Sequence, residues 1–234
     1  MIKILASDYD RTFYINDEDI EKNKKAIEDF KRAGNIFIIA TGRSYYHFMN
    51  KVKQYNIDYD YAIINHGATV IDRQSNIIYN MPMSNEIIND LKKDLQLDRS
   101  TDNFCCSNLE TNVPFEHKDL TKINVKYKTK KESIEMNKLI NEHYSDFVTS
   151  YNITSSSIEI ISNKTNKSKT IQMLADKLNI AKKDIYTIGD GYSDIQMIKD
   201  FNGYCMKESV KELKNVAIGE CESVSSLVYN IMKK

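Results

Sequence analysis

The chain has 234 residues, of which 41% are hydrophobic and 28% charged, and its 33 basic and 33 acidic side chains give a formal net charge of zero. This composition is typical of a globular protein, and the lack of a basic excess argues against a nucleic-acid-binding protein. No apolar run approaches the length of a membrane span, and the N-terminus has no signal-peptide pattern. The four cysteines lack metal-ligand spacing, so we expect reduced thiols and a cytoplasmic location.

The first predicted strand ends in a pair of carboxylates. An apolar run over residues 2–6 is typical of a short buried strand, and Asp8 and Asp10 follow it. Their spacing places both side chains on one side of an extended chain. One of them can act as a nucleophile or metal ligand and the other as an acid/base, although an acidic turn explains the same residues.

The next elements predict a parallel sheet. Apolar spacing over residues 17–33 indicates a helix that ends near Gly34, and residues 36–40 form a second unbroken apolar run. Strand, helix and strand in succession predict a right-handed βαβ unit. The second strand ends in Thr41 and Gly42, which can offer a hydroxyl and backbone N–H groups to an anion; a capped helix start explains the pair equally well.

The pattern changes after a third strand at residues 61–65 and a hairpin at residues 69–79. His66 lies beside the end of the third strand, where a lone histidine favours a structural role. The following block contains helices near residues 84–95 and 136–143, an irregular polar stretch at 103–116, a half-solvated strand at 123–127, and strands at 147–151 and 158–161. Alternating strands of this kind predict a separate antiparallel or mixed α+β module inserted into a parallel-sheet domain.

The parallel-sheet pattern then returns. An amphipathic helix is predicted over residues 167–179, and a strand at 185–188 ends in Gly189 and Asp190, shortly before Asp194. The remaining predicted elements are a helix after Asp194, short strands at 203–206 and 216–218, and a helix at 224–232.

Three predicted strands thus end in polar clusters: Asp8 with Asp10, Thr41 with Gly42, and Asp190 with Asp194. The carboxyl ends of parallel strands share one edge of a sheet, so we expect these clusters to meet. Carboxylates crowded together need a cation, and hard oxygen ligands suit Mg²⁺, which commonly bridges to a substrate phosphate. Lys167, at the start of its helix, adds a positive charge.

Four segments in this order carry a family resemblance: DYDRT at residues 8–12, TGR at 41–43, the lysine of NKSKT at 166–170, and GDGYSD at 189–194. They resemble the motifs of the haloacid dehalogenase superfamily of aspartate-nucleophile phosphatases. The block between TGR and the lysine motif resembles the cap of the Cof-type branch. The resemblance implies an α/β fold, with a Rossmann-like three-layer core at residues 1–81 and 162–234 and an α/β cap at residues 82–161.

The resemblance also implies roles for individual residues. Asp8 resembles the nucleophile that forms an aspartyl-phosphate, and Asp10 resembles the general acid/base. Thr41 and the Gly42 amide resemble the phosphate-binding pair, and Lys167 resembles the lysine that neutralises the phosphate and the nucleophile. Lys169 is a rival for the lysine role.

A magnesium site is implied by the same resemblance. Asp190 resembles the acidic metal ligand, and Asp194 resembles its partner, as a ligand or as a group behind the ligands. Asp8 and the backbone carbonyl of Asp10 are the other expected Mg²⁺ ligands.

Three residues depart from the family pattern. Arg11 stands where the family usually has glycine, which places a cation beside the site. Ser193 stands where the family has asparagine, and its hydroxyl keeps one of the amide's hydrogen bonds in positioning phosphate or lysine. His66 replaces the asparagine of an Asn-Gly-Ala motif, where it could contact substrate, although the sequence favours a structural role.

The function implied is magnesium-dependent hydrolysis of a small phosphate ester, with a sugar phosphate as the first choice and no nucleic-acid or membrane partner. A phosphomutase or other phosphotransferase with the same nucleophile is an alternative. A phospho-ligand-binding regulatory protein that has lost turnover is another, favoured only by Arg11 and Ser193. Neither the particular substrate nor the oligomeric state can be predicted.

Overall fold

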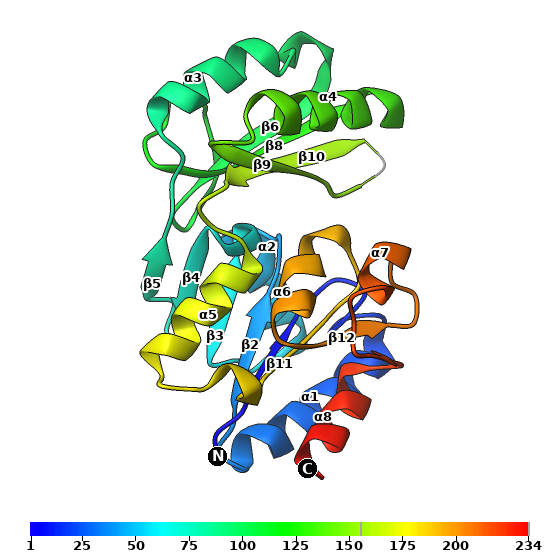
Figure 1. The fold of residues 1–234 in the computed structure, drawn as a ribbon. Helices are drawn as coiled ribbons and strands as arrows, with labels where there is room; N and C mark the ends of the chain where they lie inside the picture. Colours follow the sequence, from blue (N-terminus) through cyan, green and yellow to red (C-terminus); the bar gives the residue numbers. More distant parts are fainter. Residues whose placement is uncertain (155, 234) are drawn as a thin grey trace.

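The computed structural model describes residues 1–154 and 156–233, and two β-sheets organise them (Figure 1). The larger sheet has eight strands in the spatial order β13 (Gly219–Cys221), β12 (Asn202–Met206), β11 (Ile185–Gly189), β1 (Ile4–Ser7), β2 (Ile36–Ala40), β3 (Tyr61–Ile64), β4 (Thr69–Asp72) and β5 (Ile77–Asn80). The first six of these strands are parallel, and β4 and β5 extend the sheet as an antiparallel hairpin.

Helices cover both faces of the larger sheet. One face packs against α1 (Asp17–Arg32), α2 (Tyr45–Tyr55) and α8 (Val224–Met232), and the other against α5 (Lys167–Lys177), α6 (Ile195–Asp200) and the short α7 (Lys211–Lys214). The central strand β1 is fully buried because it lies between two layers of helices, which is why its sequence is an unbroken apolar run. The predicted three-layer α/β core is therefore confirmed.

The parallel register brings the ends of three strands together. Ser7, the last residue of β1, pairs with Ile188 of β11 on one side and with Ile39 of β2 on the other. The residues that follow these strands therefore emerge at one edge of the sheet, as the βαβ reading predicts.

The second sheet is antiparallel and lies at that edge, above the first (Figure 1). Its strand order is β7 (Glu110–Val113), β6 (Ser100–Ser107), β8 (Leu120–Tyr127), β10 (Ser157–Ser162) and β9 (Val148–Asn152). Two helices, α3 (Asn85–Asp94) and α4 (Lys130–His143), pack on its outer face around Ile123, Val125 and Ile158. The inner face presents polar side chains toward the larger sheet. We call residues 85–162 the upper unit.

Three details of the sequence prediction were wrong. Residues 103–116 are not an irregular stretch, because β6 and β7 form a hairpin within them that gains its register from β8. The strand β8 is not half-solvated, since helices cover one of its faces and the larger domain covers the other. The last strand is Gly219–Cys221 rather than residues 216–218, which belong to the turn after α7.

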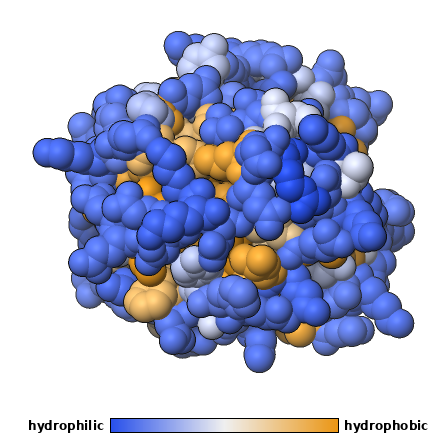
Figure 2. All heavy atoms as spheres, turned by 90° about the horizontal axis from the view of Figure 1, so that it is seen from above, coloured by the Kyte–Doolittle hydropathy of each residue, from blue (hydrophilic) through white to orange (hydrophobic). Residues whose placement is uncertain are grey.

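The surface over the upper unit is mainly hydrophilic, and hydrophobic residues show there in small patches between charged side chains (Figure 2). Across the described ranges, none of the helices combines the length and apolar character that a bilayer crossing requires. The four cysteines are buried and free.

Gly67 sets the position of the helix that begins with Lys167. It follows β3 in a tight turn at φ +109°, and a Cβ atom there would lie 2.4 Å from the carbonyl carbon of Asn166, the N-cap of α5. The Gly67 carbonyl also accepts a hydrogen bond of 2.7 Å from the hydroxyl of Thr165. The turn and the start of α5 are thus fixed against each other.

We predict that Gly67→Ala destabilises the protein by about 2 kcal/mol or more, because a strained φ and a backbone clash act together. Gly34→Ala is the matched control: Gly34 has φ +82°, but nothing lies within 4 Å of its added Cβ. It should lose only about 1 kcal/mol, the cost of the left-handed backbone alone. Urea unfolding measures both. Equal losses would show that the contact with Asn166 contributes nothing.

Candidate active site

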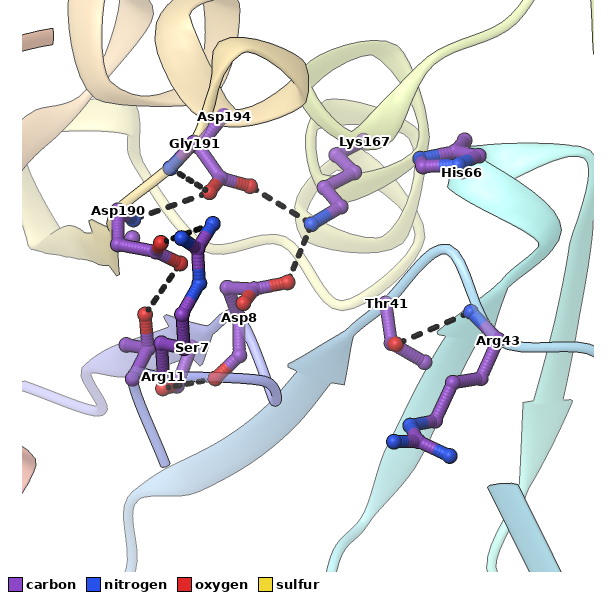
Figure 3. Close-up of polar contacts among 12 residues, drawn as sticks. Ser7, Asp8, Arg11, Thr41, Arg43, His66, Lys167, Asp190, Gly191 and Asp194 are labelled. Atoms are coloured by element: carbon purple, nitrogen blue, oxygen red, sulfur yellow. Dashed lines mark hydrogen bonds and ion pairs between the residues drawn. The ribbon is translucent and has the colours of Figure 1, made fainter. Parts of the chain in front are cut away.

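Lys167 links the ends of β1 and β11. Its Nζ lies 2.6 Å from Oδ1 of Asp8 and 2.6 Å from Oδ1 of Asp194, and its side chain is 2% exposed (Figure 3). The other oxygen of Asp194, Oδ2, accepts hydrogen bonds from the backbone N–H groups of Asp190 and Gly191. Both oxygens of Asp194 are therefore engaged by the protein itself, which suits a residue that positions Lys167 and the loop after β11.

Asp190 completes an acidic cluster with Asp8 and Asp194. Each of the three buried residues offers a carboxylate oxygen within 4.8 Å of the others. Asp190 Oδ1 accepts a hydrogen bond from Thr12, whereas Oδ2 makes no well-aligned hydrogen bond within the described residues. The guanidinium of Arg11 lies 2.8 Å from that oxygen. Buried carboxylate oxygens crowded in this way fit a hard divalent cation such as Mg²⁺.

The crowding affects the ionisation of these groups. Burial raises the pKa of Asp8 well above its ordinary value, Asp194 and Asp190 raise it further, and Lys167 opposes them. Burial also raises the pKa of Asp190, with Asp194 adding to the effect and Arg11 opposing it. Burial alone would lower the pKa of Lys167, but Asp194 and Asp8 outweigh it and raise the pKa. Lys167 therefore stays protonated.

Asp10 is held by Arg43, the arginine of the TGR segment. The Nε and Nη2 atoms of Arg43 donate to the two carboxylate oxygens of Asp10 at 2.8 and 2.6 Å. Such a two-pronged contact fixes the plane of the carboxylate as well as its position. The Asp10 side chain remains 47% exposed and lines the cavity beside Asp8.

The loop after β2 is packed beneath a histidine. Thr41 is 1% exposed, and its Oγ1 accepts the backbone N–H of Arg43. A Cβ on Gly42 would lie 2.3 Å from the imidazole of His66, so only glycine fits there. The backbone N–H of His66 in turn donates to the Thr41 carbonyl. His66 thereby supports the loop whose hydroxyl and amide are the expected phosphate ligands.

A buried ion pair joins this loop to the upper unit. Glu159 of β10 accepts from Nζ of Lys122 at 2.6 Å and lies 2.6 Å from Nε2 of His66. Lys122 also donates to the Gly42 carbonyl at 2.7 Å. Burial alone would raise the pKa of Glu159, but Lys122 and His66 outweigh it and lower the pKa to about 2. Burial lowers the pKa of His66, although Glu159 opposes the change, so the imidazole is neutral at pH 7.

These groups surround a cavity of about 410 Å³ between the two sheets. Asp8, Asp10, Asp190 and Asp194 line it from the larger domain together with Gly42 and Ser193, and Lys122 and Glu159 line it from the upper unit. Of the two lysines that the sequence offered, Lys167 contacts Asp8, whereas Lys169 is exposed and donates to the Asn163 carbonyl. The sequence did not single out Lys122 or Glu159, because each lies in a strand whose pattern alone gives no functional signal.

Comparison with known proteins shows the family to which the chain belongs. The sequence profile of the haloacid dehalogenase-like hydrolases matches residues 5–112 and 97–226, and the chain belongs to this family. A protein of Buchnera aphidicola (subspecies Baizongia pistaciae), provisionally named a phosphatase, is 25% identical over 271 aligned positions that span all of both chains. The family match confirms the predicted hydrolase class.

Solved structures show the same fold. A haloacid dehalogenase-like hydrolase from Bacteroides thetaiotaomicron superposes with a TM-score of 0.81 and 15% identity, covering 99% of this chain and 100% of the other. A haloacid dehalogenase-like hydrolase from B. subtilis gives 0.82 and 17%, covering 99% of each chain. The resemblance in fold extends through both sheets.

We predict that Glu159→Gln lowers the free energy of unfolding at pH 7 by about 3–5 kcal/mol, because it leaves Lys122 buried without its counter-charge. The folded-state pKa of Glu159, about 2, is below its ordinary 4.5, so its stabilisation is complete above pH 4.5 and is lost as the pH falls toward 2. Denaturant unfolding from pH 7 to 3 should show the two proteins converging on acidification.

Glu116→Gln is the control for this comparison. Glu116 pairs with Lys92 on the surface of the upper unit, where screening makes such pairs weak. Its effect should be small at every pH. A similar loss in both variants would contradict the role given to the buried pair.

Proposed function

We propose that this protein is a magnesium-dependent phosphomonoester hydrolase that works through an aspartyl-phosphate on Asp8. The observation that carries the proposal is the buried contact of Asp8 with Lys167, at the floor of a cavity shared with Asp10 and Asp190. A carboxylate with one oxygen held by a fixed ammonium presents its other oxygen in a set direction. Positioning and charge neutralisation are the main requirements of phosphoryl transfer.

In the first step, an Asp8 oxygen attacks phosphorus and the bond to the leaving oxygen breaks. Because Lys167 holds Oδ1, we assign the attack to Oδ2. Asp10 gives its proton to the leaving oxygen, so the alcohol departs neutral. In the second step Asp10 takes a proton from water, the water oxygen attacks the phosphorus of the aspartyl-phosphate, and Asp8 and inorganic phosphate are released. Arg43 keeps Asp10 at the cavity beside Asp8, and one of its two hydrogen bonds to Asp10 would open so that the freed oxygen can carry the proton.

The phosphoryl oxygens would lie against the Thr41 hydroxyl, the Gly42 amide and Lys167. Asp8 and Asp190 would hold Mg²⁺, together with the Asp10 carbonyl, and Asp194 and Ser193 would position the loop and the lysine. When bound, the ion supplies charge neutralisation at the transferring group. Asp194 serves through its contacts with Lys167 and two backbone amides, which already occupy both of its oxygens.

We further propose that residues 82–161 act as a cap that selects the substrate, with residues 1–81 and 162–234 as the catalytic core. Lys122 and Glu159 face the cavity from this unit, and the cavity volume suits a small phosphorylated metabolite, for which a sugar phosphate is our first choice. The protein would act in the cytoplasm.

We predict that the protein releases phosphate from para-nitrophenyl phosphate in the presence of Mg²⁺ and that chelation by EDTA stops the reaction. Asp8→Asn should lower kcat about 10³-fold or more, since an amide cannot form the acyl-phosphate. Asp98→Asn, at an exposed position in the upper unit, should leave kcat unchanged. Equal turnover by wild type and Asp8→Asn, or none by wild type with any divalent ion on a panel of metabolite phosphates, would refute the proposal.

Arg11 should compete with the metal. The backbone of Arg11 adopts φ 59°, and the guanidinium lies 2.8 Å from an Asp190 oxygen that we assign to Mg²⁺. We predict that Arg11→Gly lowers the Mg²⁺ concentration for half-maximal effect about two- to fivefold, the range of a weak exposed ion pair. Magnesium titrations monitored by both turnover and thermal melting measure it. Arg73→Gly, which removes a surface pair with Asp58, is the control; an unchanged or higher Mg²⁺ requirement in Arg11→Gly would contradict the competition.

A further inference from the structure

A second cavity, of about 480 Å³, lies in the upper unit between α4 and the edge strand β9. It is distinct from the cavity above Asp8. The residues of interest along its wall are Ile134, Asn137, Ser150, Tyr151, Asn152 and Tyr192. Five of these belong to the upper unit, and Tyr192 reaches it from the loop after β11. We call this cavity the α4–β9 groove.

Three oxygen atoms in the α4–β9 groove are shielded from solvent and have no hydrogen-bond partner among the described residues. They are Asn137 Oδ1, Ser150 Oγ and Asn152 Oδ1. Ser150 is only 4% exposed. A buried polar atom without a partner costs about 1–3 kcal/mol, so three in one cavity indicate that something else supplies their hydrogen bonds.

The groove interrupts a regular contact between helix and strand. The edge of β9 is first covered where the Val148 N–H donates to the Tyr144 carbonyl. Two residues along the strand, the Ser150 N–H donates to the Asn141 side chain, which donates back to the Ser150 carbonyl. One further step, four residues back on the helix and two on along the strand, leads to Asn137 and Asn152, which both line the groove.

No hydrogen bond joins that last pair in the described part of the chain, and the cavity lies there instead. The two asparagines therefore face a space that neither side chain spans. A molecule in this space would meet acceptor oxygens from the helix and from the strand. Tyr192 and Ile134 line the same space.

We propose that the α4–β9 groove binds a sugar or polyol group. Neighbouring hydroxyls can donate to the three oxygens at once, and the C–H face of a sugar ring packs on aromatic and aliphatic side chains. The groove resembles ligand sites in general, which combine apolar walls with a few convergent polar groups. This inference goes beyond the proposed function and does not depend on turnover.

The groove adjoins the active-site cavity. Thr154 lines both cavities, and Tyr192 in the groove directly precedes Ser193 in the active site. The Tyr151 ring packs on the ring of His66, with 4.9 Å between their centroids. The hydroxylated group can therefore come from two sources: the distal part of an extended substrate, or a free sugar that binds beside the active site.

The test is a titration of the ¹⁵N-labelled protein with neutral probes, D-glucose and sorbitol, followed by amide chemical shifts without Mg²⁺. We expect saturable shifts at residues 133–137, 150–152 and 192. Asn137→Leu fills part of the groove and removes one acceptor, and should weaken binding about tenfold or more, as loss of a hydrogen bond worth about 1.4 kcal/mol would. Asn89→Leu, at an exposed position on α3, should bind like wild type.

Two outcomes would overturn the proposal. One is the lack of saturable shifts with either probe, which would leave the groove holding water only. The other is a set of shifts confined to the active-site cavity and unaffected by Asn137→Leu. A melting temperature of Asn137→Leu equal to or above that of wild type would show that the variant is folded, as expected when an unpartnered polar atom is removed.

The same probes distinguish the two sources when added to the para-nitrophenyl phosphate assay. If the groove holds the distal part of an extended substrate, the added sugar should raise KM without changing kcat, because sugar and substrate compete for the same extended site. If the groove instead binds a free sugar beside the active site, the added sugar should change kcat. Should the proposed phosphatase activity fail, the shift titration still decides whether the groove binds sugars.

Discussion

The Lys167 ammonium, placed between Asp8 and Asp194, is the interaction on which the candidate site depends. Three carboxylates meet at one edge of the sheet, and without a compensating charge their burial would favour protonation. Lys167 keeps the balance, and its own position is set by a chain of contacts that starts at Gly67, passes through the N-cap Asn166, and fixes the first turn of α5. The backbone of the turn at Gly67 thus determines the position of the Lys167 ammonium.

The acidic cluster and the Lys122–Glu159 pair above it both contain buried carboxylates, and different groups compensate their negative charge. In the larger domain, Lys167 compensates part of the negative charge of Asp8, Asp190 and Asp194. In the upper unit, Glu159 is already balanced by Lys122 and supported by neutral His66. The charge of the first arrangement is only partly compensated by the protein, whereas the second forms a paired contact at the wall of the same cavity.

Much of the fold could be predicted because solid apolar runs such as residues 36–40 have few alternatives to a buried parallel strand. The hairpin of β6 and β7 could not, since its polar residues resemble a loop until β8 supplies the register. In the same way, the segments DYDRT and GDGYSD identify Asp8 and Asp190 as candidate site residues. The contacts of Asp10 with Arg43 and of Lys122 with Glu159 join residues 33 and 37 positions apart, and no local pattern predicts such pairs.

The contacts of Lys122 with Glu159 and the Gly42 carbonyl respond differently to a movement of the upper unit and to a substitution. Lys122 and Glu159 lie in adjacent strands of the upper unit, so if that unit swings away they keep their contact with each other, enter water together, and lose only their contacts with Gly42 and His66. Removing one group by substitution leaves the other stranded in the interior. Opening between the two sheets would therefore cost less than either substitution, because neither charge would be left buried alone.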